Sequence, residues 1–257
     1  SNDATLLHIA AEKGHHDIAQ ACITSGSSVN AAMKNKATPL FLAAQEGHLS
    51  IVTTLIAHNA DVNRCREDGV TPLFIAAQEG KTHVVKTLIQ NRADINKSRI
   101  DNAGPIHAAT SFGHLEIVKT LINTGSNVDS AMNSGITPLH IAATKNALKI
   151  VGLLIAQGAD VDLVFTKMTQ GNRALTVFDT ACNSKIKEML ALFSCSSNVV
   201  AKLTNNDIDQ YRPFIKKRFM KSCVQIFSTI KKMILTLLLV SSRISHLPTD
   251  SVLALPL

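Results

Sequence analysis

A period of 33 residues is the sequence feature that most constrains how this chain can fold. Thr5, Thr38, Thr71, Gly104 and Thr137 each stand 33 residues after the one before. The likeness is strongest where Thr-Pro-Leu-Phe, an apolar residue and Ala-Ala-Gln-Glu-Gly follow one another, once from Thr38 and again from Thr71. A fixed spacing over five copies predicts a repeat architecture, in which each unit buries its apolar surface against its neighbours.

Each copy reads as two short helices joined by a tight turn. In the third copy, Thr71 can cap the first helix, and Pro72 suits the first helical position because its missing N–H has no partner to lose there. Gly80 can end that helix in a left-handed conformation. The apolar spacing from Val84 to Leu88 then gives a second helix one buried stripe. A short connecting segment then leads to the next copy.

These motifs resemble those of the ankyrin-repeat family. Thr137-Pro-Leu-His140 matches its helix start, Gly47-His48 its inter-helix turn, and Ala60-Asp-Val-Asn63 its repeat ending. The resemblance covers about residues 2–193. It implies an all-α solenoid of helix-turn-helix units with hairpin-like fingers, and a protein partner bound on the concave face that the fingertips and first helices form.

The spacing divides the chain into repeats and a tail. We expect repeats at about 1–36, 37–69, 70–102, 103–135 and 136–171, and a degenerate C-terminal cap at 172–193. From Thr137 to the next start, Thr176, the spacing is 39 residues, so about six extra residues lie within 164–172. Residues 194–257 form a basic and then apolar tail that is partly helical or disordered.

Several positions depart from the family pattern. Phe41 and Phe74 occupy the slot of His8, and because Phe cannot hydrogen-bond, we expect looser turns there. Asn59 and Arg92 replace a turn Gly and must adopt positive φ, which costs Arg about 1 kcal/mol. The first copy also lacks a leading finger, so we expect its outer apolar face to be open to water and the chain to be a fragment or a processed form.

Composition narrows the functional classes. Residues 1–193 hold 17 Lys and Arg against 16 Asp and Glu, whereas residues 194–257 hold 9 against 3, so nearly all of the net charge of +7 belongs to the tail. The five cysteines are widely spaced and form no Cys-x-x-Cys pair. This pattern argues against a disulfide scaffold or a zinc site and favours a reducing compartment.

The histidines do not predict catalysis or metal binding. His8, His107 and His140 share one slot of the repeat, and His15, His48 and His114 share another, so the repeat explains six of the ten. The sequence has no P-loop, dinucleotide fingerprint or nucleophile elbow. We therefore expect no enzyme activity, no metal, no cofactor and no small-molecule substrate.

The resemblance places partner binding on fingertips and first-helix ends. Mapped by the 33-residue spacing, these positions are Lys34, Asn35, Gln45, Glu46, Arg66, Glu67, Asp68, Gln78, Glu79, Arg99, Asp101, Ser111, Phe112, Asn133 and Lys145. Most are ordinary solvated polar positions. Phe112 differs, because an exposed aromatic residue is a favoured binding anchor. The alternative is that its ring packs against the adjacent turn.

Two further residues resemble modification sites. Leu55 to Asn63 and Leu88 to Asn96 each read Leu, five residues, Asp-Val/Ile-Asn. In ankyrin proteins, this pattern resembles the site at which an oxygen-dependent hydroxylase modifies Asn. The simpler interpretation of Asn63 and Asn96 is structural, as turn-forming residues.

The tail leaves two functions open. The leading hypothesis is a non-catalytic interaction module or scaffold in the cytoplasm or nucleus. The other is a membrane-associated adaptor, or a fragment of a larger membrane or signalling protein, attached through Phe214–Val240. Lys231 and Lys232 interrupt the apolar run, which fits a membrane surface better than a spanning helix. Flotation with and without anionic liposomes would separate the two. Lys216-Lys-Arg218 is too little to predict nucleic-acid binding, although it could serve nuclear import.

Overall fold

The computed structural model describes residues 3–166 and 174–191, and the fold in these ranges is a series of helix pairs. The pairs are α1 (Leu6–Lys13) with α2 (His16–Thr24), α3 (Pro39–Glu46) with α4 (Leu49–Ala57), α5 (Pro72–Gln78) with α6 (Thr82–Gln90), α7 (Pro105–Ser111) with α8 (Leu115–Asn123), and α9 (Pro138–Thr144) with α10 (Leu148–Ala156). They match the five predicted repeats. The fold is therefore an all-α repeat solenoid, as the sequence predicts.

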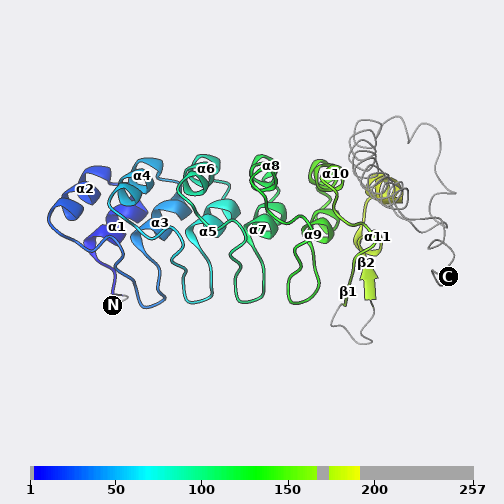
Figure 1. Ribbon diagram of the computed structural model, residues 1–257, viewed down its shortest axis with the longest axis horizontal. Coiled ribbons are helices and arrows are strands. Elements are labelled where there is room, and N and C mark those ends of the chain that lie inside the picture. Colours follow the sequence, from blue (N-terminus) through cyan, green and yellow to red (C-terminus); the bar gives the residue numbers. More distant parts are fainter. Residues whose placement is uncertain (1–2, 167–173, 192–257) are drawn as a thin grey trace, which may run out of the picture. The chain divides into compact units, whose positions relative to one another are not determined.

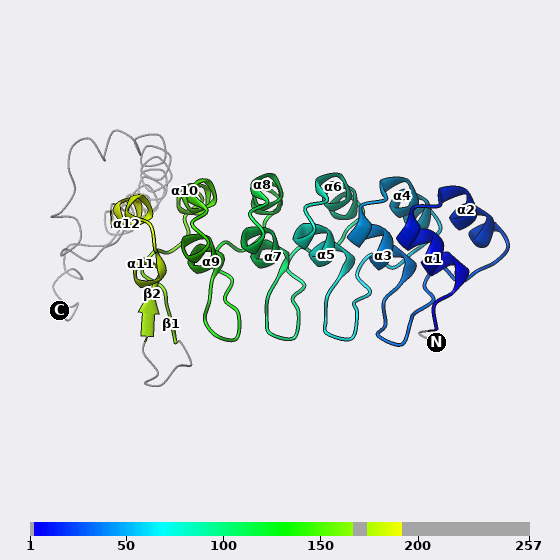
Figure 2. The same cartoon turned by 180° about the vertical axis from the view of Figure 1, so that it is seen from behind.

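The helices form two rows. The inner helices lie side by side in one row, and these are α1, α3, α5, α7 and α9 (Figure 1). The outer helices, α2, α4, α6, α8 and α10, lie in the other row. The segments between repeats project from the inner row as fingers, all on the same side. Figure 2 shows the same order from behind. Each inner helix packs against the inner helix of the next repeat and against its own outer helix.

The inner helices begin as the sequence predicts. Thr38 and Thr71 are extended, and each hydroxyl oxygen accepts the backbone N–H three residues later, at 3.2 Å and 3.1 Å. Both threonines are buried, so the capping bond also satisfies a hydroxyl that has little access to water. Gly104 has no side-chain oxygen to accept such an N–H, so α7 begins without the hydroxyl cap.

Small residues set the distance between neighbouring repeats. Ala43, Ala44, Ala76 and Ala77 on α3 and α5 are fully buried, and they leave room for adjacent inner helices to approach closely. The outer helices add branched side chains, of which Val85 on α6 is one. Because each repeat covers its neighbour's apolar face, stability resides mainly in the contacts between repeats.

Two backbone positions confirm the expected strain. Asn59 and Arg92, which lie just after the second helices of their repeats, have φ of 64° and 66°. This is the left-handed region, which glycine occupies at no steric cost and which arginine disfavours. The turn geometry therefore overrides the residue's own preference at Arg92.

A second inter-repeat contact comes from one side chain per repeat. Asn63 Oδ1 accepts the Asp94 N–H at 2.8 Å, and its Nδ2 donates to the Arg92 carbonyl at 3.3 Å. Asn30 makes the same pair of bonds one repeat earlier, to Asp61 and Asn59. Asn96 occupies this position in the third repeat, but within residues 3–166 and 174–191 its side chain has no hydrogen-bond partner. We call this pair of asparagine side-chain hydrogen bonds the inter-repeat clamp. It is therefore missing between the third and fourth repeats.

The buried histidines hold fingers to inner helices. His107 Nδ1 accepts the Gly104 N–H at 3.1 Å, and Nε2 donates to the Ser130 carbonyl at 2.9 Å. His8 makes the equivalent contacts with the Thr5 N–H and the Ala37 carbonyl. Burial lowers the pKa of His8 and His107, and it lowers the pKa of His140 to about 4. The neutral imidazole is therefore part of the folded structure.

The fourth repeat buries polar groups at positions where other repeats carry alanine. Thr110 is fully buried at the position of Ala44 and Ala77, and Ser126 is buried at the position of Ala93. Neither hydroxyl has a hydrogen-bond partner in the described part of the chain. A buried hydroxyl without a hydrogen-bond partner lowers the stability of the fold by about 1–3 kcal/mol. The buried polar groups of the fourth repeat are therefore less fully hydrogen-bonded than those of its neighbours.

After the fifth repeat, a strand pair replaces the usual finger. β1 (Val164–Thr166) pairs antiparallel with β2 (Ala174–Thr176), with Val164 opposite Thr176. Of residues 164–172, where six extra residues are expected, 167–172 lie outside the described residues, so the place of the insertion stays a prediction. Two helices follow, α11 (Val177–Thr180), which packs on α9, and α12 (Ser184–Ala191), which packs on α10.

The first repeat is open on its outer face, as expected. Leu6, Ile9 and Ile18 are exposed, whereas Ile51, which corresponds to Ile18 in the second repeat, is fully buried by the repeat before it. The tail from residue 194, including Lys216-Lys-Arg218 and Phe214–Val240, lies outside the described residues, and its roles stay predictions. Within the described ranges, no helix has the length and apolarity that crossing a membrane requires.

Because Asn63 forms the inter-repeat clamp and Asn96 does not, Asn63 should contribute more to the stability of the fold than Asn96 does. We expect Asn63→Ala to lower the free energy of unfolding by about 1–2 kcal/mol, because two inter-repeat hydrogen bonds are lost. Asn96→Ala is the matched control, since it truncates the same position in the next repeat, and we expect a change within about 0.5 kcal/mol. Urea unfolding of the full chain, followed by circular dichroism, measures both. Equal losses in the two variants would show that the clamp carries no stability.

The buried histidines predict a loss of stability in mild acid. A histidine whose folded pKa is lowered contributes stability above its unfolded pKa of about 6.5 and loses it as the pH falls toward the folded value. For His140, with a pKa of about 4, the loss between pH 7.5 and pH 5 is about 2 kcal/mol. Urea unfolding at both pH values should show a smaller difference for His140→Phe than for the wild type. His15→Phe, at an exposed histidine, should leave the difference unchanged.

Candidate functional site

The predicted binding positions lie on one surface, which we call the finger face. It consists of the fingertips at residues 33–36, 66–69, 99–102 and 132–135 and of the C-terminal ends of the inner helices. Each fingertip is a tight turn closed by two backbone hydrogen bonds. In the second, Gly69 N–H donates to the Arg66 carbonyl at 3.0 Å and Arg66 N–H donates to the Val70 carbonyl at 2.8 Å. The fourth residue of each tip has positive φ, including Lys36 at 64° and Gly69 at 85°.

Backbone hydrogen bonds join each fingertip to the next. Glu67 N–H donates to the Asn35 carbonyl at 2.9 Å, Ile100 N–H to the Asp68 carbonyl at 3.2 Å, and Asn133 N–H to the Asp101 carbonyl at 2.9 Å. Asn133 Nδ2 also donates to the Ile100 carbonyl at 3.2 Å. The four fingertips therefore form one connected edge. Since their backbones are already ordered, a partner loses little binding free energy in ordering them.

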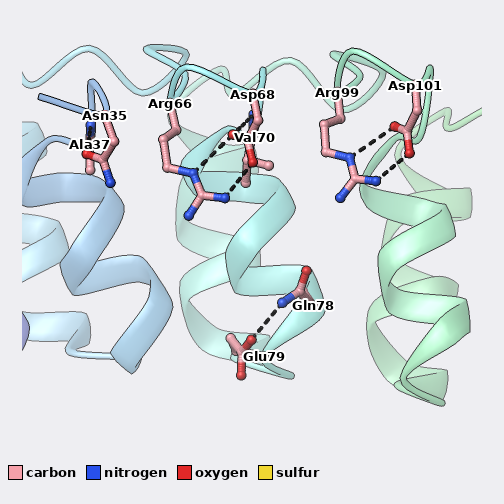
Figure 3. A network of polar contacts seen from close by, with 9 residues as sticks. All are labelled: Asn35, Ala37, Arg66, Asp68, Val70, Gln78, Glu79, Arg99 and Asp101. Carbon is pink, nitrogen blue, oxygen red and sulfur yellow. Dashed lines mark hydrogen bonds and ion pairs between the residues drawn. The ribbon is translucent and has the colours of Figure 1, made fainter.

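Two neighbouring fingertips carry the same ion pair (Figure 3). Arg66 Nε donates to Asp68 Oδ1 at 3.0 Å, and Nη2 donates to the other carboxylate oxygen. Arg99 and Asp101 repeat this arrangement one finger later. Each arginine lowers the pKa of its aspartate, and Oδ1 of each aspartate also accepts a backbone N–H, from Val70 or Ala103. These four predicted binding residues therefore brace their fingers and neutralise one another.

The arginines also explain the two phenylalanines in the histidine slot. The Arg66 guanidinium lies over the Phe41 ring, with Cζ 5.4 Å from its centroid, and Arg99 lies 6.0 Å from the centroid of Phe74. Both rings are buried. Phe cannot make the histidine hydrogen bonds, and a cation–π contact and a bidentate ion pair contact the finger instead. The expected looseness of these turns stays a prediction.

At the helix ends, glutamine and glutamate form repeated pairs. Gln45 Nε2 donates to Glu46 at 3.1 Å, and Gln78 Nε2 donates to Glu79 at 2.9 Å. Figure 3 shows Gln78 and Glu79 at the end of their helix that points away from the fingers. In the next two repeats, the same two positions hold Ser111 with Phe112, and Thr144 with Lys145.

Phe112 is exposed, as the anchor hypothesis requires. Its side chain is 59% exposed, and its ring stacks on His114 of its own repeat, with centroids 6.4 Å apart and planes within 9°. His114 Nε2 in turn donates to the Gln78 carbonyl at 2.9 Å, which fixes the imidazole against the previous repeat. The ring is thus held in place with most of its surface free.

Sequence reasoning missed Ile100. This residue lies at the third fingertip, between the paired Arg99 and Asp101, and is 75% exposed. The corresponding positions of the neighbouring fingertips hold Lys34, Glu67 and Asn133. A comparison of this position across repeats, as made for Phe112, could have found it, because an apolar residue stands out among three polar ones.

The remaining predicted positions divide into held and free groups. Asn35 Oδ1 accepts the Ala37 N–H at 3.0 Å, whereas Lys34 is exposed. Asn63 is engaged by the inter-repeat clamp, so Asn96 has the more available carboxamide of the two modification candidates. No group of three potential metal ligands occurs within the described residues. The modification of Asn63 and Asn96 stays a prediction.

The ion pair and ring contact predict a stabilising role for Arg66. Arg66→Met installs the residue that Met33 provides at the first fingertip, and it should lower the free energy of unfolding by about 1 kcal/mol, because the pair is partly exposed. Arg64→Met is a control on the same finger, at an exposed arginine. Thermal unfolding of the full chain at low and high salt measures both. A loss as large for Arg64→Met would contradict the bracing role.

Comparisons with known proteins agree with this geometry. None of the curated proteins compared with the chain matches it significantly. A family model for ankyrin repeats in three copies matches residues 7–99 and 97–164, which is more than half of the chain. Ankyrin repeats are generally protein–protein interaction modules and are typically non-catalytic. The chain therefore belongs to the ankyrin-repeat family.

Proposed function

We propose that this protein is a non-catalytic interaction module or scaffold that binds a segment of a protein partner on its finger face. The observation that carries the proposal is the connected row of fingertips, which presents exposed side chains from a backbone already held by hydrogen bonds. A surface that is ordered before binding retains more of its contact energy as affinity.

Exposed apolar side chains on the finger face support the same proposal. Phe112 and Ile100 are two of the most exposed large apolar residues in the described ranges, and both lie on this surface. Large exposed side chains of this kind mark interaction sites when polar groups surround them. Here their neighbours include Glu79 and the Arg99–Asp101 pair.

For location, we propose the cytoplasm or nucleus. Three cysteines in the described ranges, Cys22, Cys65 and Cys182, are free thiols. Free thiols of different burial fit a reducing compartment. A fluorescent fusion followed in cells tests this, and secretion of the fusion would contradict it.

The proposed surface predicts which variant loses its partners. Full-length wild type, Glu67→Lys with Phe112→Ala, and a control with Glu116→Lys and Leu49→Ala are used to capture proteins from cell lysate for mass spectrometry. The control makes the same two kinds of change at exposed positions of the outer helices α8 and α4. We expect the finger-face variant to lose about tenfold or more in recovery, because truncating an anchor costs about 2 kcal/mol or more.

Circular dichroism first establishes that all three proteins have the same helical content. Arg66 and Asp68 are left intact, since they brace the second finger. Proteins recovered equally by all three would place binding outside the finger face and would overturn the proposal.

A further inference from the structure

The two edges of the finger face carry matching chemistry on either side of the inner helices α5 and α7. One edge is the fingertip row, Lys34, Glu67, Ile100 and Asn133, and the other is the helix-end row, Glu46, Glu79, Phe112 and Lys145. When each fingertip is grouped with the inner helix that follows it, Glu67 and Glu79 flank α5, and Ile100 and Phe112 flank α7. An acidic band therefore lies beside an apolar band, one repeat apart.

Ion pairing decides which charges of this surface remain available. Arg66 and Arg99 are each bound by an aspartate of their own finger. Within the described ranges, no ion pair includes Glu46, Glu67 or Glu79, and all three are exposed. The two fingertip arginines are therefore neutralised within their own fingers, whereas the carboxylates of Glu67 and Glu79 stay available to a partner beside α5.

We propose that the finger face selects protein segments in which a basic residue stands about three positions from a large apolar residue. This inference rests on the proposed function and names the chemistry of the partner. The basic residue contacts Glu67 or Glu79, and the apolar residue contacts Phe112 or Ile100. Opposite charge across the interface attracts the correct partner and rejects acidic ones.

The spacing follows from the packing of the repeats. Neighbouring packed helices have axes about 8–10 Å apart. An extended chain advances about 3.3 Å per residue, so it passes from the acidic band to the apolar band in about three residues. An inner helix of seven residues, such as α5, is about 10 Å long, so long Arg or Lys side chains from a central segment reach either edge.

Selection from a random peptide library tests this chemistry without a known partner. A phage library of random dodecapeptides is selected on the immobilised full chain, on Glu67→Lys with Glu79→Lys, and on Ile100→Ser with Phe112→Ser. Asp17→Lys with Glu116→Lys is the matched control, because it reverses two exposed acidic residues on the outer helices α2 and α8.

The wild type and the control should enrich peptides with Arg or Lys about three positions from a large apolar residue. Each finger-face variant should lower the recovery of these peptides about tenfold, and the loss caused by the charge reversal should be greatest at low salt. Replacing the basic residue of an enriched peptide with Glu should restore its binding to Glu67→Lys with Glu79→Lys.

Two results overturn the inference and separate it from the proposed function. Enriched peptides that need the finger face but carry acidic or purely neutral residues refute the basic partner and leave the finger face as the binding site. Enrichment that no finger-face variant changes, or no enrichment at all, refutes the inference; the first of these also removes support from the proposed function.

Discussion

The structure depends on the burial of one repeat's apolar face by the next. Ala43, Ala44, Ala76 and Ala77 are completely buried between inner helices that could not approach so closely with larger side chains. No single repeat encloses these surfaces, so the position of every finger is set by contacts between repeats rather than within one. The row of fingertips, and with it the candidate binding surface, is a consequence of this stacking.

The chain uses two different solutions to hold a finger against its inner helix. In one, a buried neutral histidine such as His107 bonds to the helix start and to a finger carbonyl. In the other, a buried phenylalanine is covered by an arginine that an aspartate of the same finger fixes, as with Phe74, Arg99 and Asp101. The histidine solution weakens in acid because the ring must stay neutral. The arginine solution keeps its charge across this range and is instead screened by salt.

Much of the fold could be predicted from the sequence because the 33-residue period repeats local signals. The Thr38 and Thr71 caps and the positive φ of Asn59 and Arg92 were all accessible from residue type and position. Side-chain pairing was not, because nothing in the period shows that Asp68 turns back to Arg66 two residues away.

The candidate site was predictable in position but not in chemistry. The repeat alignment assigned the finger-face residues to fingertips and helix ends, yet it treated arginines held in ion pairs and glutamates outside ion pairs alike. The ion pairs show the difference between the two residues: the charge of Arg66 is neutralised by Asp68, whereas the charge of Glu67 is available to a partner. Ile100 escaped notice because exposure of an isolated apolar residue depends on how its fingertip turns, which a residue pattern does not specify.

The fourth repeat combines an exposed aromatic side chain of the finger face, Phe112, with poor internal hydrogen bonding. Thr110 and Ser126 bury hydroxyls without partners, and Asn96 makes no clamp to this repeat. In a one-dimensional array, a break at this junction divides the stack into two shorter and separately weaker stacks. A ligand that contacts both the third and the fourth repeat would stabilise the junction between them. Binding of this ligand would then also slow amide hydrogen exchange in repeats that the ligand does not contact.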